Sequence, residues 1–546
     1  MPDFSHNCWW RDGVIYQIYP RSFKDTTGNG VGDLQGIIEN LDHLVDLGVD
    51  ALWISPIFPS PMADFGYDVS DYTDVHPLFG TLETMERLFE AAHDRRLQVV
   101  LDFVPNHSSD QHPWFIESRS SRENPKREWY VWRDAKPDGS VPNNWLSVFG
   151  GSAWEWDAAT GQYYLHSFLK EQPDLNWRND GVRAAMFDVL RFWLDRGVDG
   201  FRIDVAHYIM KDPEFRDNPA RPESPEDFFK PMGEYATQDH LYDKGHPDVH
   251  GVFQEMRTLA DSYNATGERF LAGEIHIFEV SKWAAYYGRA GDELHFPLNF
   301  GLIKAGWTAE AIRRSVDALE ATIREGDWPN YVLGNHDEPR LATRYGEVQA
   351  RIAAMLLLTL RGTPTLYYGD EIGMLDVVIP PDRIQDPWPL RSGILEINRD
   401  PCRTPMQWTG GPGAGFSPAD AEGSTPEPWL PVHPNHAHVN VEHQRADPGS
   451  IYNLYRRLLR VRRDTPALVR GSYRPIESPA GTFVYLRELD DARRLVVLNF
   501  TDEPKMIRIP AHLVGRLEIS TQMDRAGESV ADGVLTLGGH EACLLS

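Results

Sequence analysis

Three carboxylates each lie where a short apolar segment of the chain ends. Asp204 closes GFRID, Glu274 closes FLAGE, and Asp337 follows YVLGNH. Breaking a glycosidic bond requires one carboxylate that attacks or stabilises the anomeric carbon and one carboxylic acid that protonates the leaving oxygen. The three residues are therefore candidate catalytic groups for the cleavage of a glycosidic bond.

The residues around these acids fit a catalytic site. Arg202 lies two positions before Asp204, so in a strand both side chains share one face. We expect Arg202 to keep Asp204 ionised, and crowding of carboxylates to raise the pKa of at least one acid so that it stays protonated near neutral pH. A single Asp or His at a strand end is more often structural. Four motifs in order, DFVPNHSSD, GFRIDVAHY, GEIH and LGNHDEPR, favour a functional site.

Eight short apolar segments, separated by stretches of helical periodicity, are the elements that would position these residues. They are 14–19, 51–55, 98–103, 200–204, 270–273, 294–298, 331–333 and 365–368, with amphipathic helices expected at 34–47 and 82–95. This alternation predicts an α/β fold with a parallel sheet, and eight repeats favour a closed (β/α)8 TIM barrel. Chemistry in such a barrel lies where strands end, so we expect the three carboxylates to converge on one mouth.

Composition divides the chain further. We expect the barrel over residues 1–104 and 179–465, with an inserted subdomain over 105–178, after the third strand, that is rich in Trp, Asn, Pro and Gly. An extended loop over 376–450 follows the eighth strand. Short alternating segments at 482–487, 494–499 and 506–509 predict a C-terminal antiparallel β-domain, similar to a β-sandwich, over 466–546.

The charge and the cysteines limit the partners. With 54 basic and 81 acidic residues among 546, the net charge of -27 argues against nucleic acid and anionic membranes and is compatible with a neutral small-molecule substrate. Three cysteines far apart do not form a disulfide framework. We find neither a signal peptide nor an apolar run of the ~20 residues that a membrane span needs, and expect a cytoplasmic protein. The sequence gives no preference between monomer and dimer.

The four motifs resemble the signature regions of the α-amylase family of glycoside hydrolases (family 13). The segments QPDLN, RTPMQW and WWRDGVIYQIYPRSF make the chain most similar to its oligo-1,6-glucosidase and α-glucosidase branch, over essentially the whole length. This resemblance implies a retaining mechanism. It makes Asp204 the nucleophile, Glu274 the general acid/base, and Asp337 the third carboxylate, which grips sugar hydroxyls and distorts the ring.

The same resemblance implies a pocket for one terminal glucose. Its expected members are His107, Arg202 and His336 as hydrogen-bonding residues, Tyr67 as the stacking ring, Phe168 as a wall beside the leaving group, and Asp64, which with an arginine blocks the far end. We choose Arg403 as that arginine, with Arg399 in the same loop as the alternative. Val205, directly after the nucleophile, resembles enzymes that accept α-1,6 bonds, although Ala206 and His207 depart from the branch and a packing role for Val205 is equally favoured.

The loop DTTGNGVGD at residues 25–33 has oxygen side chains at alternate positions and glycines for tight turns, as in the first half of an EF-hand loop. In the resembling branch this loop holds a structural Ca²⁺ or Mg²⁺. The corresponding ligands are Asp25, Thr27, Asn29, Asp33 and the carbonyl of Val31. The alternatives are a polar turn without metal, and a phosphate cradle, which acidic residues at both ends disfavour. No organic cofactor is expected.

The sequence thus predicts an exo-acting retaining α-glucosidase that releases terminal glucose from short α-glucosides, with transglucosylation at high substrate concentration. The alternative is a dedicated transglucosidase or an isomerase of the trehalose synthase or sucrose isomerase type, since the three carboxylates would be the same. A non-catalytic protein like a transporter heavy chain is disfavoured, because it would lack a catalytic carboxylate and carry a membrane span.

Overall fold

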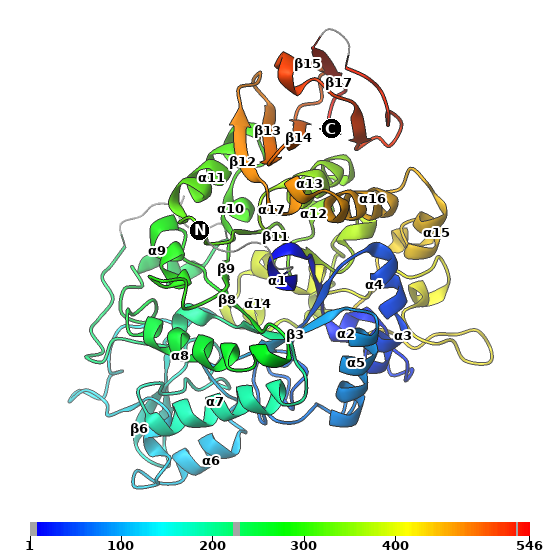
Figure 1. The fold of residues 1–546 in the computed structure, drawn as a ribbon. Helices are drawn as coiled ribbons and strands as arrows, with labels where there is room; N and C mark the ends of the chain where they lie inside the picture. Colours follow the sequence, from blue (N-terminus) through cyan, green and yellow to red (C-terminus); the bar gives the residue numbers. More distant parts are fainter. Residues whose placement is uncertain (1–7, 222–229, 531–532) are drawn as a thin grey trace.

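The computed structural model describes residues 8–221, 230–530 and 533–546, and its centre is a sheet of eight parallel strands (Figure 1). The strands are β1 (Ile15–Ile18), β2 (Ala51–Ile54), β3 (Gln98–Phe103), β7 (Gly200–Ile203), β8 (Phe270–Glu274), β9 (Phe296–Leu298), β10 (Asn330–Val332) and β11 (Thr363–Tyr367). Each lies at a segment that the sequence predicts to be a strand. Nearly all of their residues are buried, as expected for strands covered on both faces.

The sheet closes on itself. Its order is β10-β11-β1-β2-β3-β7-β8-β9, and every pairing within it is parallel. The two ends of this order meet where the backbone N–H of Val332 in β10 donates to the carbonyl of Asn299, just after β9, at 3.2 Å. The predicted (β/α)8 barrel is confirmed.

Helices cover the barrel. They include α5 (Leu82–Asp94), α7 (Asp180–Leu194), α8 (Val249–Asp261), α11 (Ala309–Thr322) and α13 (Glu347–Thr359). The predicted helix over 34–47 is instead two helices, α3 (Leu34–Glu39) and α4 (Leu41–Leu47). They are separated at Asn40, whose φ of -111° and ψ of 11° are not helical and whose side-chain amide donates to the carbonyl of Gly36 at 2.8 Å. A side chain that bonds to nearby backbone competes with helix continuation.

Two long insertions surround the mouth of the barrel. Between β3 and α7 the chain forms a three-stranded antiparallel sheet of β4 (Trp132–Arg133), β6 (Gln162–Leu165) and β5 (Trp154–Asp157). After β11, residues 376–450 form short helices, such as α14 (Pro387–Ser392), joined by irregular segments. This second insertion packs on the loop after β1. The φ of Gly30 is +82°, and a Cβ at this position would lie 2.3 Å from the carbonyl oxygen of Glu427, so only glycine fits there.

The C-terminal region is a small sandwich with two apolar faces. A five-stranded sheet of β12 (Ser472–Ile476), β13 (Thr482–Leu489), β14 (Ala492–Asn499), β18 (Ala542–Leu545) and β16 (Leu517–Ser520) lies beside a pair, β15 (Lys505–Arg508) and β17 (Val534–Leu537). Along β13, Val484 and Leu486 join an apolar cluster with β15 and β17, whereas Phe483 and Tyr485 join the barrel core. The Tyr485 hydroxyl lies 2.5 Å from that of Thr359 in α13.

None of the helices in the described ranges combines the length and the apolar character that crossing a membrane requires.

Candidate active site

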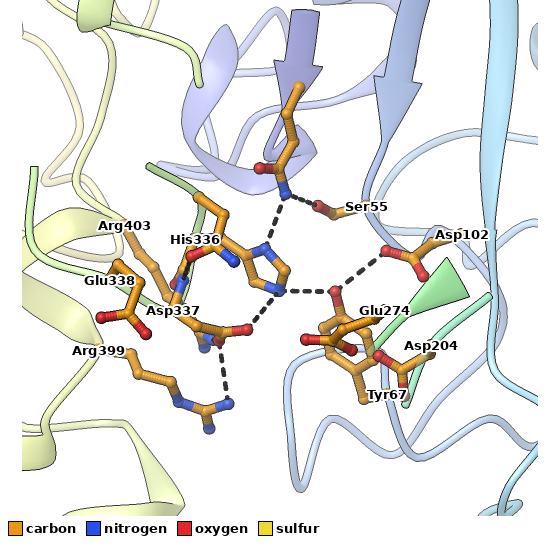
Figure 2. A network of polar contacts seen from close by, with 12 residues as sticks. Ser55, Tyr67, Asp102, Asp204, Glu274, His336, Asp337, Glu338, Arg399 and Arg403 are labelled. Carbon is orange, nitrogen blue, oxygen red and sulfur yellow. Dashed lines mark hydrogen bonds and ion pairs between the residues drawn. The ribbon is translucent and has the colours of Figure 1, made fainter. Parts of the chain in front are cut away.

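The three candidate carboxylates converge at the carboxyl ends of their strands (Figure 2). Asp204 directly follows β7, Glu274 is the last residue of β8, and Asp337 lies in the loop after β10. All three line one pocket. The sequence prediction that they share one mouth agrees with this placement.

A single guanidinium joins three of the acids at this site. Arg202 in β7 is buried, and its Nη1 lies 2.6 Å from Oδ1 of Asp204 and 2.7 Å from Oδ1 of Asp102. Its Nη2 lies 2.7 Å from Oε2 of Glu274. Arg202 therefore sits behind the carboxylates and outside the pocket lining, so this geometry does not place it for the direct contact with a sugar that the resemblance implies.

Sharing this one cation sets the protonation of the cluster. Burial raises the pKa of Asp204 well above its usual value despite Arg202, and the charges of Glu274 and Asp102 add to the increase. Burial also raises the pKa of Glu274, but Arg202 and His276 lower it by more, so it lies well below its usual range. Burial and the Arg202 guanidinium thus act on these carboxyls in opposite directions, and the expectation that Arg202 keeps Asp204 ionised stays a prediction.

A chain of hydrogen bonds fixes the Tyr67 ring, which the resemblance places under the sugar (Figure 2). The amide of Gln17 donates to Nδ1 of His336 at 2.7 Å, so Nε2 of this imidazole carries the hydrogen and donates to the Tyr67 hydroxyl at 2.7 Å. That hydroxyl in turn donates to Asp102 at 3.1 Å. Burial lowers the pKa of His336 to about 3, which keeps the ring neutral. Tyr67 and His336 are held parallel, with ring centroids 5.5 Å apart.

His107 and Phe168 form another wall of the pocket. Their rings lie 5.2 Å apart, and burial lowers the pKa of His107 to about 4, so it is a neutral hydrogen-bonding group. Nε2 of His107 lies 3.2 Å from the amide of Gln172, which also donates to Asp64 at 3.3 Å. The motif QPDLN thus contributes a polar side chain to the pocket, a role that the sequence did not assign to Gln172.

The far end of the pocket is closed by an ion pair, and its arginine is not the one we chose. Arg399 lies 2.8 Å from Asp64, and Asp386 holds the same guanidinium from behind at 2.7 Å. Arg403 is fully buried outside the pocket lining and pairs with Asp337 at 2.7 Å. The choice of Arg403 for this role is therefore corrected to Arg399.

Asp337 stays ionised between these two arginines. Burial raises the pKa of its carboxyl, but the positive charges of Arg403 and Arg399 lower it by more and hold it well below its usual range. A carboxylate that does not exchange protons and accepts hydrogen bonds from sugar hydroxyls is the role that the resemblance implies for Asp337.

Several pocket residues were not predicted as site residues: Val148, Phe149, Gln172, Tyr208, Lys230, Met232, Tyr235, Lys244, His276, Phe278, Glu338 and Trp388. The motifs QPDLN, GFRIDVAHY, GEIH and LGNHDEPR contain four of these residues, namely Gln172, Tyr208, His276 and Glu338. Their position beside predicted site residues could have identified them. Most of the others come from irregular segments, where neither periodicity nor strand-end position marks a residue.

Val205 has a strained backbone directly after the nucleophile. Its φ of 35° and ψ of 45° lie in the left-handed region, which a β-branched residue rarely adopts. In this conformation its N–H donates to Oε2 of Glu274 at 3.0 Å, and its side chain lines the pocket. Strain of this kind concentrates at functional sites, where surrounding contacts maintain it.

The loop after β1 places two buried carboxylates close to its backbone. Asp25 accepts from the N–H groups of Gly28 at 2.8 Å and Gly30 at 2.9 Å, and Asp33 accepts from that of Thr26 at 2.8 Å. Neither acid makes an ion pair within the described residues, and Asn29 directs its side-chain oxygen at the N–H of Val31. No group of three His, Cys, Asp or Glu side chains in the described part of the chain is placed to hold a metal, so any ion here would depend on a mixed oxygen set.

Comparison with known proteins places this geometry in a family. The model of the α-amylase catalytic domain matches residues 17–471, which is most of the chain. The chain belongs to the α-amylase family. Within this family it is 42% identical over 520 residues to a probable α-glucosidase of Rhizobium meliloti, covering 93% of this chain and 92% of that protein. It is 37% identical to an oligo-1,6-glucosidase of Parageobacillus thermoglucosidasius, with 93% of each chain covered. The predicted branch is confirmed.

Solved structures of the α-amylase family show the same architecture with other stated activities. An α-glucosyl transfer enzyme superposes with a TM-score of 0.90 at 41% identity, covering 99% of this chain and 100% of that one. A trehalulose synthase of Pseudomonas mesoacidophila superposes with a TM-score of 0.88 at 36% identity, covering 99% of both chains. Proteins of this fold thus include ones named as α-glucosidase, as an α-glucosyl transfer enzyme and as a trehalulose synthase.

Proposed function

We propose that the protein is an exo-acting retaining α-glucosidase that releases the non-reducing terminal glucose of short α-glucosides. The observation that carries the proposal is the convergence of Asp204, Glu274 and Asp337 on a pocket whose inner end is closed by Asp64 and Arg399. A closed end leaves room for a chain terminus, so cleavage would occur one glucose unit from it. The names of the similar glucosidases support the same activity.

The reaction would take two steps. In the first, the Asp204 carboxylate bonds to the anomeric carbon, the glycosidic C–O bond breaks, and the proton of Glu274 passes to the leaving oxygen. In the second, Glu274 takes a proton from water, whose oxygen bonds to the anomeric carbon as the bond to Asp204 breaks. The first step needs the proton on Glu274. Asp204 has to be ionised at the same time, with the Arg202 guanidinium at 2.6 Å beside it.

Product analysis tests this function. Incubation with maltose, isomaltose and sucrose at high concentration is expected to give free glucose as the main early product, followed by transglucosylation products. Absence of glucose, isomer and oligosaccharide from all three would refute the proposal. The alternative, a dedicated transglucosidase or isomerase, is supported by the two similar solved structures, and a predominance of transfer products or of rearranged sucrose would establish it.

The closed end of the pocket gives a second test. Replacing Asp64 by Ala removes the partner of Arg399 and opens space beyond the first sugar, so maltotriose should yield maltose as well as glucose, and kcat/KM for maltose should fall by about 10²-fold. Chromatography of early products measures both. Glu155→Ala, at a half-buried position of β5 outside the pocket lining, is the matched control. Strictly terminal glucose release by the Asp64 variant would contradict the blocking role.

For the loop after β1 we propose a structural Ca²⁺ or Mg²⁺ held by Asp25, Thr27, Asn29, Asp33 and the carbonyl of Val31. Two buried carboxylates that form no ion pair with any described residue, among oxygen donors of a tight turn, fit a hard cation. Chelation with EDTA should remove a stabilisation of about RT ln(1 + [L]/Kd) from the free energy of unfolding and so lower the melting temperature by several degrees. Added calcium or magnesium should restore the melting temperature. A melting curve that responds to neither would contradict the site.

A further inference from the structure

The two oxygens of Glu274 have different surroundings. Oε2 accepts from the guanidinium of Arg202 at 2.7 Å and from the backbone N–H of Val205 at 3.0 Å. Both donors are groups that do not accept a proton at ordinary pH, and together they engage both lone pairs of this oxygen. The proton that Glu274 exchanges with a substrate therefore has to reside on Oε1.

Oε1 has one protein contact, and it is a histidine on the pocket wall. Nε2 of His276 lies 2.9 Å from Oε1, and no other side chain or backbone group of the described residues bonds to this oxygen. His276 is two residues after Glu274, its side chain is 30% exposed, and it lines the pocket. Its ring is stacked on Phe300, with centroids 4.4 Å apart and an interplanar angle of 11°, so the imidazole cannot swing away without losing this contact.

We propose that His276 is a positioning residue for the catalytic proton of Glu274. Its Nε2–H donates to one lone pair of Oε1, which leaves the other lone pair for the proton and for the leaving oxygen or the attacking water. This hydrogen bond favours the ionised form of Glu274, the form that takes the proton from water in the second step. The arrangement also matters in that step because Asp204 is then an uncharged ester, and Arg202 and His276 remain on Glu274. This inference rests on the proposed glucosidase function.

The role predicts a shift in pH dependence. His276 lowers the pKa of Glu274, so removing it raises that pKa. In His276→Phe, which keeps a ring over Phe300, the alkaline flank of kcat/KM for maltose should move up by about one pH unit, because the acid holds its proton longer. The acidic flank of kcat for p-nitrophenyl α-glucoside, where base catalysis limits the rate, should move in the same direction.

The leaving group provides a second readout. The leaving group of maltose is its second glucose, a poor leaving group that depends on protonation by Glu274, whereas p-nitrophenolate leaves without protonation. His276→Phe should therefore lower kcat/KM for maltose about tenfold more than for the aryl glucoside. His276→Gln keeps an N–H donor and should recover most of that ratio. His250→Gln is the matched control, since His250 pairs with Glu293 at 2.7 Å away from the pocket lining, and should keep the wild-type profile.

The outcomes separate the two proposals. If both substrates lose rate by the same factor and neither flank moves in folded His276→Phe and His276→Gln variants, His276 has only a packing role and the inference is overturned. If the wild-type protein releases no glucose from either substrate, the proposed function fails first. Melting curves of each variant show whether the fold is kept.

Discussion

Replacing Asp204 by Asn is expected to reduce glucose release by about 10⁴-fold or more, because an amide cannot form the covalent intermediate. The side chains are nearly equal in size, and Arg202 still finds Asp102 and Glu274 as partners at 2.7 Å, so the fold should persist. Steady-state rates with an aryl α-glucoside and circular dichroism measure the two effects. Asp212→Asn is the control, since this buried carboxylate pairs with Arg216 at 2.8 Å outside the pocket lining, and it should keep activity.

Azide distinguishes the nucleophile from a residue that only assists. In Asp204→Gly, azide can enter the space of the missing carboxylate and displace the aryl group, which gives the β-glucosyl azide. In Glu274→Ala the glucosyl-enzyme still forms on Asp204, and azide replaces water in the second step, which gives the α-glucosyl azide. The same anomer from both variants, or full activity of the Asp204 variants, would contradict the assignment.

Replacing Arg202 by Met should cost both activity and stability. Asp102, Asp204 and Glu274 would then share a buried site without the cation that contacts all three, and removing one partner of a buried ion pair typically costs about 3–5 kcal/mol. The acids would relieve this by binding protons, so we expect kcat/KM to fall by about 10³-fold and the melting temperature to drop.

Arg202→Lys provides the matched comparison. It keeps the charge, but one ammonium cannot reproduce the fork that reaches Asp204 and Glu274 with different nitrogens. An intermediate loss of activity with most of the thermal stability retained is expected. Wild-type activity in Arg202→Met would show that the shared guanidinium does not set the protonation of the cluster.

The strands and their catalytic ends could be predicted because the signals are local. A mostly apolar segment such as QVVLDF is typical of a strand that is buried on both faces, and the residue at the end of such a strand lies at the barrel mouth. Asp204, Glu274 and Asp337 follow from this rule once the strands are recognised. The split between α3 and α4 was missed because periodicity continues through Asn40 while its side chain bonds to the backbone.

The rest of the pocket depends on contacts between distant parts of the chain. Arg399 and Arg403 are four residues apart in one irregular segment, and Asp386, a residue elsewhere in the same insertion, holds the guanidinium that reaches Asp64. The protonation of Asp204 was predicted from its neighbour Arg202 alone. The structure adds Asp102 and Glu274, which contact the same guanidinium and whose negative charges raise the pKa of Asp204.

The double-faced C-terminal sheet also has a consequence for how the chain can be shortened. Phe483 and Tyr485 belong to the barrel core, and the guanidinium of Arg487 donates to the carbonyl of Thr359 at 2.6 Å. A truncated form ending before β12 would thus expose apolar surface on the outer helices and leave carbonyl groups there without their donors. Such a form is expected to aggregate. The C-terminal sheet is therefore an integral part of the barrel's core rather than a separable domain. Directed evolution of this enzyme should treat the barrel and the C-terminal sheet as one cooperative unit.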